Sequence, residues 1–571
     1  MDYSSNQKQT VKLCHVCQGA RFYYLFSIAD HRVVRCDDCD LVFLNPQPSD
    51  EVLARIYNAG YFLGSESEAG RQAVREIKQA TARFYLAEIH RYRGGNRGRL
   101  LEVGCGDGDF LVSAEAAGWQ VTGIEYSAAA CETARQRLKS GAVRCGELAA
   151  AQLPAEQFDL CVISDVIEHV RSPLDVLQEI HRVLKPGGAL FIATPSSDSW
   201  SARLMRQRWM EFKPEHLTYF NRQNLQTALF KSGFRDIIVQ PGWKILSFDY
   251  IRLHFQRFPV ALVTPVLNFL ARILPQKMQL KHRRIVASGM MGFSRKAELA
   301  PPMLSIIVPA FNEVKTFGAL METVLRKELP GLRMEIIVVE SNSTDGTREL
   351  ALTYQNHPHV KLMLEDQPRG KGHAVRAGLS AATGDYILIQ DADLEYDLED
   401  YDGLLEPLVA GRAAFVLGSR HGGRNVWKMR QFTGQHSLSL FVNFGHWFFT
   451  TLINVLFFQR LRDPFTMFKV FRRDCLYALE FECDRFDFDF ELLIKLIRKG
   501  YHPVELPVNY RSRSFKDGKK VRMFRDPLTW LKALARLRFA EIDPMKIVEQ
   551  TQAKKTVGEI SISVPPAAPK P

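Results

Sequence analysis

The stretch that decides the fold of the first half reads LLEVGCGDGDF, residues 100–110. Apolar residues lead into glycines at 104, 106 and 108, and a helix is expected to open behind them. A ligand can then approach the backbone closely, and its carboxylate can meet helix N-terminal amides. A dinucleotide-binding fingerprint would need its third glycine at position 109, where Asp109 would repel a pyrophosphate. The stretch therefore favours a ligand other than a nicotinamide or flavin dinucleotide.

Strands and helices alternate outward from this loop. A helix is expected over residues 70–93, and the strands of the first half are expected at 100–103, 121–124, 160–164 and 189–193. A second alternation follows the linker 298–302, with strands expected at 304–308, 335–339, 361–364, 386–390 and 415–418. Such alternation predicts parallel sheets with helices on both faces. The expected fold class is therefore α/β, with two doubly wound domains behind a small cysteine-bearing segment.

Length and composition agree with several domains. The chain has 571 residues, of which 46% are hydrophobic and 24% charged, which excludes a wholly disordered chain and disfavours one compact domain. The expected divisions are 1–58, 60–297, 298–302, 303–545 and 546–571, the last a proline-bearing tail expected to be disordered. No apolar run reaches the roughly 18–20 residues of a spanning helix, and the N-terminus does not read as a signal peptide, so a cytoplasmic location is expected.

Four of the ten cysteines are expected to hold zinc. Cys14 and Cys17 form one C-x2-C knuckle, and Cys36 and Cys39 form a second one after 18 intervening residues. Two such knuckles can bring four thiolates onto one tetrahedral ion, and because no position is left for water, the site is expected to be structural. In a reducing compartment the other six cysteines are expected to be unpaired core residues.

The region 60–297 resembles class I S-adenosylmethionine-dependent methyltransferases and, with its zinc knuckles, their sugar-methylating branch. The likeness rests on the glycine loop, on Glu125 at the end of the second strand, on DVIEHV at 165–170 and on LKPGG at 184–188. A carboxylate such as Glu125 can accept hydrogen bonds from both ribose hydroxyls of a nucleoside. The resemblance implies cofactor contacts at Glu102, Gly104, Gly106, Gly108, Glu125, Gly146 and Glu147, with Asp165 above the methionine moiety.

Two histidines are candidate bases for methyl transfer. His169 and His216 both follow a carboxylate, and His216 lies in EHLTYF at 215–220, which resembles a segment of the same branch. A neutral imidazole can take a proton from a sugar hydroxyl. For each histidine, holding a loop through hydrogen bonds is the open alternative.

The second alternating region has its polar residues at strand ends. The apolar strand at 386–389 runs into QDAD at 390–393, an earlier strand runs into PAFNE at 309–313, and another ends at Glu340. Two carboxylates one residue apart at a strand end can hold Mg2+ or Mn2+ through oxygen, and such an ion bridges a nucleotide diphosphate. The order of these segments predicts a site for a nucleotide diphosphate, with Asp391 and Asp393 as metal ligands.

Residues 303–525 resemble family 2 glycosyltransferases of the GT-A type, and among them polyprenyl-phosphate sugar synthases such as dolichol-phosphate mannose synthase. Further shared segments are GSR at 418–420, RDPFTMF at 462–468, DFDFELL at 487–493 and the basic run at 511–520. The resemblance implies nucleotide contacts at Pro309, Phe311, Glu313, Glu340 and Asp391, an acceptor-side general base at Asp489 with Glu491 as runner-up, and phosphate contacts at Arg511, Lys519 and Lys520. The chain departs from the family where Glu340-Ser341-Asn342 replaces two Asp and a Gly, which leaves the nucleotide open.

The net charge of +12 is unevenly distributed. No acidic residue occurs between Asp249 and Glu298 or between Glu406 and Asp463, and both stretches combine basic residues with short apolar or aromatic runs. This pattern predicts contact with a membrane surface, although the same helices could instead pack inside the domains.

The leading hypothesis is a bifunctional enzyme of glycan or glycolipid assembly, peripheral on the cytoplasmic face of a membrane. It would methylate a sugar from S-adenosylmethionine and transfer a sugar, with inversion, from a nucleotide sugar to a polyprenyl phosphate or lipid-linked glycan. One alternative makes the first half a non-catalytic scaffold, against which the complete glycine loop and Glu125 argue. Another is a zinc-ribbon nucleic-acid-binding protein, which the acidic residues of the cysteine segment disfavour, so no nucleic acid is expected as partner.

Overall fold

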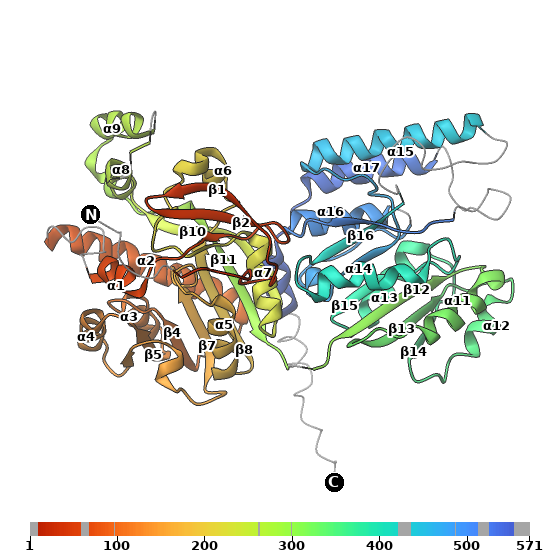
Figure 1. Ribbon diagram of the computed structural model, residues 1–571, viewed down its shortest axis with the longest axis horizontal. Helices are drawn as coiled ribbons and strands as arrows, with labels where there is room; N and C mark the ends of the chain where they lie inside the picture. Colours follow the sequence, from red (N-terminus) through yellow and green to blue (C-terminus); the bar gives the residue numbers. More distant parts are fainter. Residues whose placement is uncertain are drawn as a thin grey trace, which may run out of the picture. The chain divides into compact units, whose positions relative to one another are not determined.

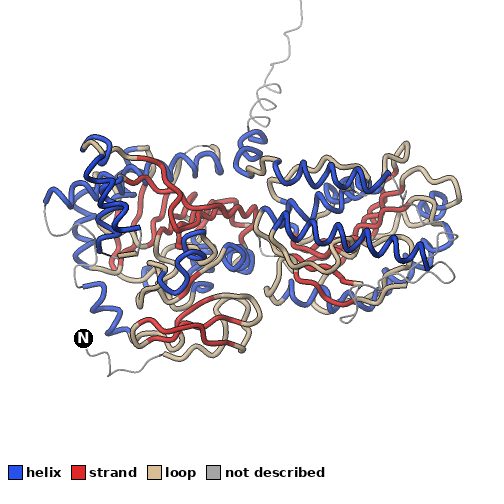
Figure 2. The backbone as a smooth tube through the Cα atoms, turned by 90° about the horizontal axis from the view of Figure 1, so that it is seen from above, coloured by secondary structure: helices blue, strands red, loops and turns tan. Residues whose placement is uncertain are grey.

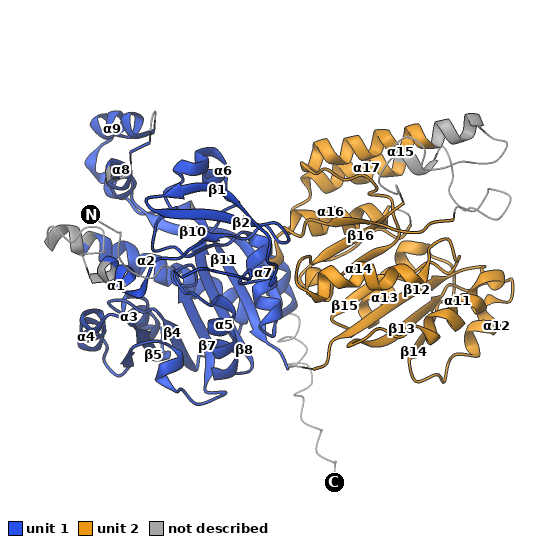
Figure 3. Ribbon diagram, viewed as in Figure 1, with its two compact units in different colours: residues 1–298, 545–571 blue, residues 299–544 orange. Residues whose placement is uncertain are grey.

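The computed structural model describes residues 9–58, 68–95, 97–257, 259–260, 263–298, 300–420, 436–485, 487–511 and 525–552. The chain divides into two compact units, residues 1–298 with 545–571 and residues 299–544 (Figures 1 and 3). In each unit helices cover both faces of a central seven-stranded sheet (Figure 2). The doubly wound α/β class predicted from the alternation is confirmed.

The main sheet of the first unit has the strand order β10-β11-β8-β7-β4-β5-β6. Its strands are β4 (Arg99–Val103), β5 (Gln120–Glu125), β6 (Ala142–Cys145), β7 (Phe158–Ser164), β8 (Leu184–Pro195), β10 (Phe234–Leu246) and β11 (Arg283–Lys296). Strands β4 to β8 pair in parallel, whereas β11 runs antiparallel to both β8 and β10. The carboxyl ends of the parallel strands therefore meet at one edge, where such folds bind their ligands.

Helices flank this sheet and connect its strands. They are α1 (Asp50–Asn58), α2 (Glu68–Arg93), α3 (Asp109–Ala116), α4 (Ala128–Arg137), α5 (Pro173–Val183), α6 (Trp200–Met205), α7 (Arg222–Lys231), α8 (Phe248–Arg257), α9 (Val263–Ile273) and α10 (Gln276–Leu280). The last three form an insertion between β10 and β11. Neither strand is among those expected from the sequence, because the register of β10 shifts around Pro241 and Gly242 and no regular alternation marks it.

A second, four-stranded sheet carries the cysteine knuckles. Its strands are β1 (Phe22–Ile28), β2 (His31–Cys36), β3 (Val42–Leu44) and β9 (Thr218–Tyr219), in the order β1-β2-β3-β9. Strand β9 comes from the segment of His216, far along the chain, and its Tyr219 packs with Val33 and Leu44 in one core. The cysteine segment is thus built into the first unit, which differs from the separate 1–58 division expected from the sequence.

The C-terminal boundary also differs from the expectation. Residues 546–552, assigned above to a disordered tail, continue a helix that packs on the first unit. Glu549 forms an ion pair of 2.6 Å with Arg91, and Gln552 donates to the carbonyl of Tyr92 over 2.7 Å. The buried Met545 and Val548, one helical turn apart, give this segment an apolar side that tail composition alone does not reveal. Residues 553–571 lie outside the described residues.

One cysteine pair corrects another expectation. Cys131 of α4 and Cys145 of β6 form a disulfide, with Cα atoms 6.0 Å apart, although all six cysteines outside the knuckles were expected to be unpaired. The pairing depends on tertiary structure: α4 packs beside β6, and this brings together two cysteines that lie 14 positions apart in the chain. The other four are buried and free: Cys105, Cys161, Cys475 and Cys483.

The sheet of the second unit has the order β14-β13-β12-β15-β17-β16-β18. Its strands are β12 (Met303–Ala310), β13 (Arg333–Glu340), β14 (Val360–Leu364), β15 (Tyr386–Ile389), β16 (Phe415–Ser419), β17 (Lys469–Arg472) and β18 (Val504–Pro507). Only β17 runs antiparallel to its neighbours. The carboxyl ends of β12, β13, β15, β16 and β18 therefore share one edge of the sheet.

Seven α-helices cover the described part of the second unit. They are α11 (Val314–Arg326), α12 (Thr347–Leu352), α13 (Lys371–Ala381), α14 (Tyr401–Val409), α15 (His436–Phe457), α16 (Phe488–Arg498) and α17 (Arg525–Phe539). Helices α15 and α17 lie side by side (Figure 1). Trp530 of α17 contacts the rings of Phe449, Phe465 and Phe490, so α15, α16 and α17 share one aromatic core.

Candidate active sites of the two units

The glycine loop of the first unit has a backbone that side chains rarely permit. The φ angle is 72° at Gly104, 50° at Gly106 and 78° at Gly108. A Cβ atom on Gly104 would lie 2.2 Å from a methyl group of Val166, whereas a Cβ on Gly106 would meet only open space. Val166, which follows β7, thus fills the space on one side of the loop, whereas the space beside Gly106 is open to a ligand.

Glu125, at the end of β5, braces this loop. Its Oε2 accepts a hydrogen bond from the amide of Gly106 over 2.8 Å, and its Oε1 accepts one from the amide of Ser127 over 2.9 Å. Its carbonyl accepts from the amide of Gly146, so the ends of β4, β5 and β6 meet here, with the exposed Glu147 next in the chain. Each carboxylate oxygen keeps a second lone pair, which can accept from a ribose hydroxyl. The site fits the nucleoside of S-adenosylmethionine.

Glu102 lies buried at the end of β4, beneath the same loop. Its Oε2 has no hydrogen-bond partner among the described residues. Burial, and then the nearby Asp109 and Glu125 carboxylates, raise the pKa of Glu102 well above its usual value. A buried orphaned oxygen is costly, and a cationic donor on a ligand, such as the ammonium of the methionine moiety, would satisfy it.

Asp165 follows β7 and lies at the same edge of the sheet. Its carboxylate forms an ion pair of 2.9 Å with Lys244 of β10. Burial alone lowers the pKa of Lys244, but the Asp165 carboxylate raises it above the ordinary value. Lys244 was not predicted from the sequence, because it lies 79 residues from Asp165 and the two residues come together through the sheet.

Glu168, His169 and His216 form one cluster behind Asp165. Their ligand atoms lie within 4.8 Å of one another, and the two imidazole rings meet edge to face at 4.7 Å. Burial lowers the pKa of His169 to about 4 and the pKa of His216 well below its usual range. Nδ1 of His216 is buried and has no hydrogen-bond partner among the described residues. Both imidazoles are therefore neutral near pH 7, as a proton acceptor must be.

Glu168 is the third member of this cluster. Its Oε2 accepts from the hydroxyl of Thr194 over 2.9 Å, and its Oε1 lies 4.0 Å from Nε2 of His169. Burial, and then the charge of Asp165, raise the pKa of Glu168 to about 8. A protonated carboxyl beside two neutral imidazoles can relay a proton; the same three residues also have the spacing to hold a metal ion.

The strand that follows His216 is held from two sides. The amides of Leu217 and Thr218 both donate to the carbonyl of Glu168, over 2.8 and 3.1 Å. Thr218 and Tyr219 pair with β3 of the knuckle sheet. The EHLTYF segment therefore joins the histidine cluster to the cysteine-bearing sheet. The position of His216 is compatible with both expected roles, a base for methyl transfer and a residue that holds its loop.

The four knuckle cysteines converge as their spacing predicts. All four sulfur atoms lie within 4.8 Å of one another, and Cys14–Cys39 and Cys17–Cys36 are each 3.5 Å apart. Helix α7 supports the knuckles, because Asn224 donates to the carbonyl of Cys39 and Lys231 to that of Val16. The four thiols fit a closed tetrahedral ion, which supports the zinc ribbon.

In the second unit, the turns after β12 and β13 interlock. Pro309 lies on β12, and Phe311 and Glu313 lie in the turn after it, where the amide of Glu313 donates to the hydroxyl of Thr347 over 2.9 Å. Glu340 is fully buried, and its oxygens accept from the amides of Asn342 and Ser343 and pair with Arg348. Glu340 therefore shapes its own loop, and its expected nucleotide contact remains a prediction.

Asp391 and Asp393 follow β15 at the shared edge. Asp391 forms an ion pair with Lys371, at the start of α13, and Asp393 accepts from the amide of Glu395 over 3.1 Å. Among the described residues neither belongs to a group of three converging ligands. Mg2+ is usually held by one or two carboxylates plus substrate phosphates and water, so these two residues fit the expected ion. Lys371 is not among the site residues expected from the sequence, because it lies 20 residues from Asp391 and the fold brings the two together.

Asp489 lies in the first turn of α16 and faces the same cluster. Burial raises the pKa of Asp489 above its usual value, although Lys469, 3.5 Å away, and Lys371 oppose the shift. The oxygen that Lys469 approaches, Oδ1, is buried and has no other partner within hydrogen-bond distance among the described residues. The structure thus brings Asp489 together with Asp391, as an acceptor-side base would require.

Glu491, the runner-up base, does not belong to this cluster. It is fully buried, and its oxygens accept hydrogen bonds from the amides of Glu482 and Cys483 and pair with Lys495 at 2.7 Å. These partners outweigh burial and lower the pKa of Glu491. A carboxylate with its oxygens so engaged anchors a loop, and the role of Glu491 as a base remains a prediction.

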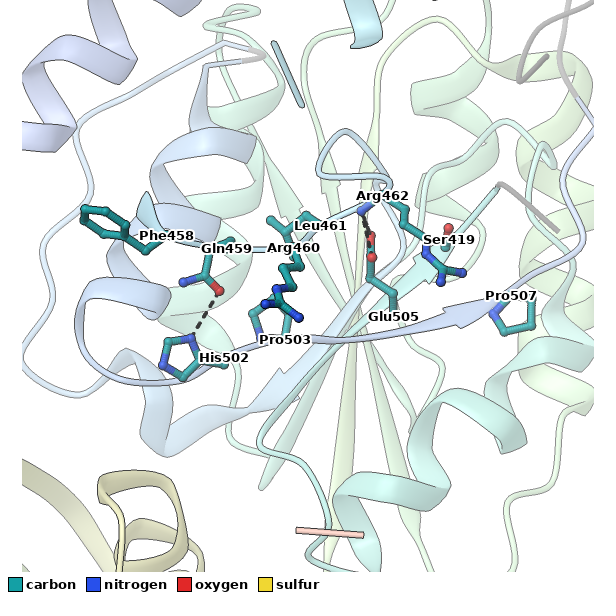
Figure 4. A pocket seen from close by; sticks show the side chains of 10 residues that line it. All are labelled: Ser419, Phe458, Gln459, Arg460, Leu461, Arg462, His502, Pro503, Glu505 and Pro507. Carbon is teal, nitrogen blue, oxygen red and sulfur yellow. Dashed lines mark hydrogen bonds between the residues drawn. The ribbon is translucent and has the colours of Figure 1, made fainter. Parts of the chain in front are cut away.

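A pocket of about 630 Å³ runs along β18 of the same unit (Figure 4). Its lining includes Ser419 and Pro507 at the carboxyl ends of β16 and β18, together with Arg460, Arg462 and His502. Close to it, Arg420 holds the fully buried Asp463 through two hydrogen bonds of 2.7 and 2.8 Å. The shared GSR and RDPFTMF segments are thus joined by a buried ion pair between Arg420 and Asp463. This ion pair stabilises the edge of the sheet where an acceptor would bind.

The expected phosphate contacts are only partly described. Arg511 is exposed, and its amide donates to the carbonyl of Glu395 over 2.8 Å, two residues from Asp393. Lys519 and Lys520 lie outside the described residues.

Each unit thus has the edge site of a group-transferring α/β enzyme. Residues 74–239 match the model of a methyltransferase domain, and residues 305–479 match that of glycosyl transferase family 2. The chain therefore joins a methyltransferase domain to a family 2 glycosyltransferase domain.

Relatives agree with the second assignment. The chain is 27% identical over 257 residues to the dolichyl-phosphate beta-glucosyltransferase of Saccharomyces cerevisiae, covering 42% of this chain and 74% of the relative. It is 27% identical over 226 residues to the low-salt glycan biosynthesis hexosyltransferase Agl6 of Haloferax volcanii, covering 38% of this chain and 51% of the relative. A solved methyltransferase of Thermotoga maritima is 19% identical, with a TM-score of 0.29, and covers 43% of this chain and 99% of its own.

Proposed function

We propose that the second unit transfers a sugar from a nucleotide sugar to a lipid-linked phosphate or glycan, and that the first unit methylates a sugar of the same class of product. The observation that carries this function is the pair of edge sites, the loop braced by Glu125 and the cluster of Asp391, Lys371 and Asp489. Relatives named for dolichyl-phosphate glucosylation support a polyprenyl phosphate as acceptor.

In sugar transfer, Asp391 and Asp393 would hold Mg2+ or Mn2+, which supplies charge stabilisation to a leaving diphosphate. Lys371 lies at the same carboxylates and adds a positive charge beside that group. A lipid phosphate is already anionic, so it needs little help from a base. Asp489 would become a true general base only for a hydroxyl acceptor, and its raised pKa suits that task.

In methyl transfer, the residues around Glu125 would hold S-adenosylmethionine, which supplies the methyl group. The neutral His216 or His169 accepts the proton of the acceptor hydroxyl, and Glu168 relays it within the cluster. Asp165 is held by Lys244 at the edge between the cofactor loop and this cluster. The four cysteines would hold a structural zinc ion that supports the strand following His216.

A peripheral position on the cytoplasmic face of a membrane fits this role. Among the described residues no helix is long and apolar enough to cross a bilayer. Helix α15 and the turn after it instead expose large apolar side chains, namely Phe444, Trp447, Phe448, Val455 and Phe458. Arg460 and Arg462 follow directly, so this end of the second unit combines apolar and cationic groups as an interfacial surface does.

Mass spectrometry of products tests the proposal. The full chain is incubated with a membrane lipid extract, Mn2+, methyl-labelled S-adenosylmethionine and a panel of nucleotide sugars. We expect a sugar to enter the organic phase with one donor, and labelled methyl to appear on that glycolipid. Transfer only to water-soluble acceptors would contradict the lipid-linked acceptor, and a product that never contains labelled methyl would favour a non-catalytic first unit.

A further inference from the structure

The insertion between β10 and β11 exposes an apolar surface that the fold does not use. No described residue of α9 is buried, and Val266, Phe269 and Ile273 are 54%, 60% and 60% exposed. With Val263 they recur every three or four residues, so they lie on one face of the helix. Leu253 of α8 and Met278 and Leu280 of α10 are exposed as well. Monomeric soluble proteins rarely leave such a contiguous apolar face uncovered.

Hydrogen bonds between α8, α9 and α10 fix the orientation of these helices and therefore of the apolar face. Gln256 of α8 donates to Asn268 of α9 over 3.0 Å, and the hydroxyl of Thr264 donates to the carbonyl of Phe255 over 3.1 Å. Gln279 of α10 donates to the carbonyl of Ala271 over 2.7 Å. The polar side of α9 therefore faces its neighbouring helices, and its apolar side is turned outward.

Beyond Asp249, which pairs with Arg252 at the start of α8, the charged residues of the insertion are all basic. No acidic residue occurs between Asp249 and Glu298. Arg272, Lys277 and Lys281 are exposed and have no ion-pair partner within the part of the chain that the structure describes. Arg284, by contrast, stacks on the rings of Phe84 and Trp243, 4.6 and 4.5 Å away, and so belongs to the fold. An apolar helix face bordered by such cations is the composition of an interfacial helix on an anionic bilayer.

The insertion begins beside the methyl-transfer site. It leaves β10 two residues after Lys244, the partner of Asp165, and α8 starts at Phe248. His254 of α8 contacts the sulfur of Met210, and Met210 lies just before Glu211 and Lys213 in the loop that leads to His216. A surface that held α9 would therefore lie close to the edge where the acceptor enters the first unit.

We propose that α8, α9 and α10 dock the methyltransferase unit on an anionic lipid bilayer, so that this unit methylates a sugar carried on a lipid. This inference rests on the proposed function, and it adds that the methyl acceptor is a sugar attached to a lipid in the bilayer. The apolar face of α9 enters the interface, and the cations at 272, 277 and 281 meet lipid headgroups. The docking surface of the methyltransferase unit is distinct from α15, which belongs to the other unit.

Hydrogen exchange on the full chain locates this docking. Peptides covering 263–281 should exchange more slowly with phosphatidylglycerol vesicles than with phosphatidylcholine vesicles, and added salt should reduce the difference. The variant Val266→Glu/Phe269→Glu should abolish the protection of α9, leave α15 protected, and lower vesicle affinity by roughly tenfold or more, since it removes two apolar contacts and repels the headgroups. Leu352→Glu/Val409→Glu, with the same change in charge at exposed sites of the second unit, should have little effect on α9.

A second measurement separates this inference from the proposed function. The α9 variant should bind S-adenosylmethionine as the wild type does, yet incorporate at least about tenfold less labelled methyl into vesicle-embedded lipid extract, because the acceptor is no longer concentrated at the site. Exchange of α9 that ignores phosphatidylglycerol overturns the inference, and so does lipid-independent protection that grows with protein concentration, which identifies a second copy as the occupant. Absence of S-adenosylmethionine binding in both proteins would instead contradict the proposed function.

Discussion

The amide of Gly106 donates a hydrogen bond of 2.8 Å to the carboxylate of Glu125, so the glycine loop and the residue expected to bind ribose form one unit. A ligand that uses Glu125 therefore meets a carboxylate whose position is already fixed. Pre-organisation of this kind means that the removal of Glu125 affects both the ribose contact and the loop.

The cofactor site should be sensitive to single changes in this loop. Glu125→Ala should weaken S-adenosylmethionine by roughly 10- to 100-fold, since hydrogen bonds to a charged group contribute about 1.5–3 kcal/mol. Gly104→Val should abolish binding, because its Cβ would lie 2.2 Å from Val166 and its φ of 72° disfavours a side chain. Isothermal titration calorimetry measures both. Gly187→Ala is the matched control, since Gly187 has a φ of 70° with nothing within 4 Å of a Cβ; equal losses in all three variants would reject the site.

The purified chain should contain one zinc ion, held by the four knuckle cysteines. Cys36→Ser/Cys39→Ser should remove it and lower methyl transfer, because the knuckle sheet pairs with the strand that follows His216. Inductively coupled plasma mass spectrometry gives the metal content, and Cys161→Ser, which changes a buried cysteine outside the knuckles, is the control. Zinc that persists in the double variant would contradict a site that needs all four cysteines.

The histidine cluster should make stability depend on pH in two opposite ways. The pKa of His169 is lowered to about 4, so the unfolded chain takes up a proton near pH 6.5 that the folded chain does not, and this group destabilises the fold as pH falls from 7 to 5. The pKa of Glu168 is raised to about 8, so the folded chain keeps a proton that the unfolded chain releases, and this group destabilises the fold as pH rises from 5 to 8.

Two variants separate these contributions. Relative to the wild type, His169→Gln should gain about 2 kcal/mol of unfolding free energy between pH 7 and pH 5, and Glu168→Gln should lose a similar amount over the same interval. Urea unfolding at the two pH values measures this, on the transition that S-adenosylmethionine shifts. Parallel pH profiles for the wild type and both variants would show that the cluster does not titrate in this way.

The metal site of the second unit should be separable from methyl transfer. Asp393→Asn should lower sugar transfer by about 100-fold, since it removes one of two charged ligands of the expected ion, and chelation should have the same effect. Methyl transfer should persist in the variant. Asp402→Asn, the same chemical change on α14, is the control and should retain sugar transfer. If Asp393→Asn loses both activities, its effect is on folding rather than on the metal.

Asp489 distinguishes the two kinds of acceptor. Asp489→Asn should lower transfer to a lipid phosphate by less than about tenfold, because an anionic nucleophile needs no base, but transfer to a hydroxyl by about 100-fold or more. Rates with a polyprenyl phosphate and with a simple alkyl glycoside measure the difference. A large loss with the phosphate acceptor would mean that Asp489 holds the metal or the donor. Glu491→Gln should reduce stability rather than alter this preference, since Glu491 anchors a loop.

Much of the candidate sites could be predicted from local sequence. The glycine loop, Glu125, Asp391, Asp393 and the cysteine knuckles are each defined by a strand end or a fixed spacing, and the structure places all of them where the pattern predicts. Glu491 has the same sequence neighbourhood as Asp489, but its side chain faces the amides of a different loop. Local patterns report which strand end a residue follows, but not which way its carboxylate points.

The two α/β units, the order of their strand-end segments and the residue types at each site could be predicted from the sequence, because the periodicity of apolar residues and the spacing of glycine, cysteine and aspartate are local properties. The distant groups that complete the sites became apparent in the folded chain alone. It pairs Asp165 with Lys244 and Asp391 with Lys371, joins the strand after His216 to the cysteine sheet, and turns the apolar side of α9 outward. These relations depend on strand order and on the packing of segments that lie far apart in the chain, and no short-range pattern encodes them.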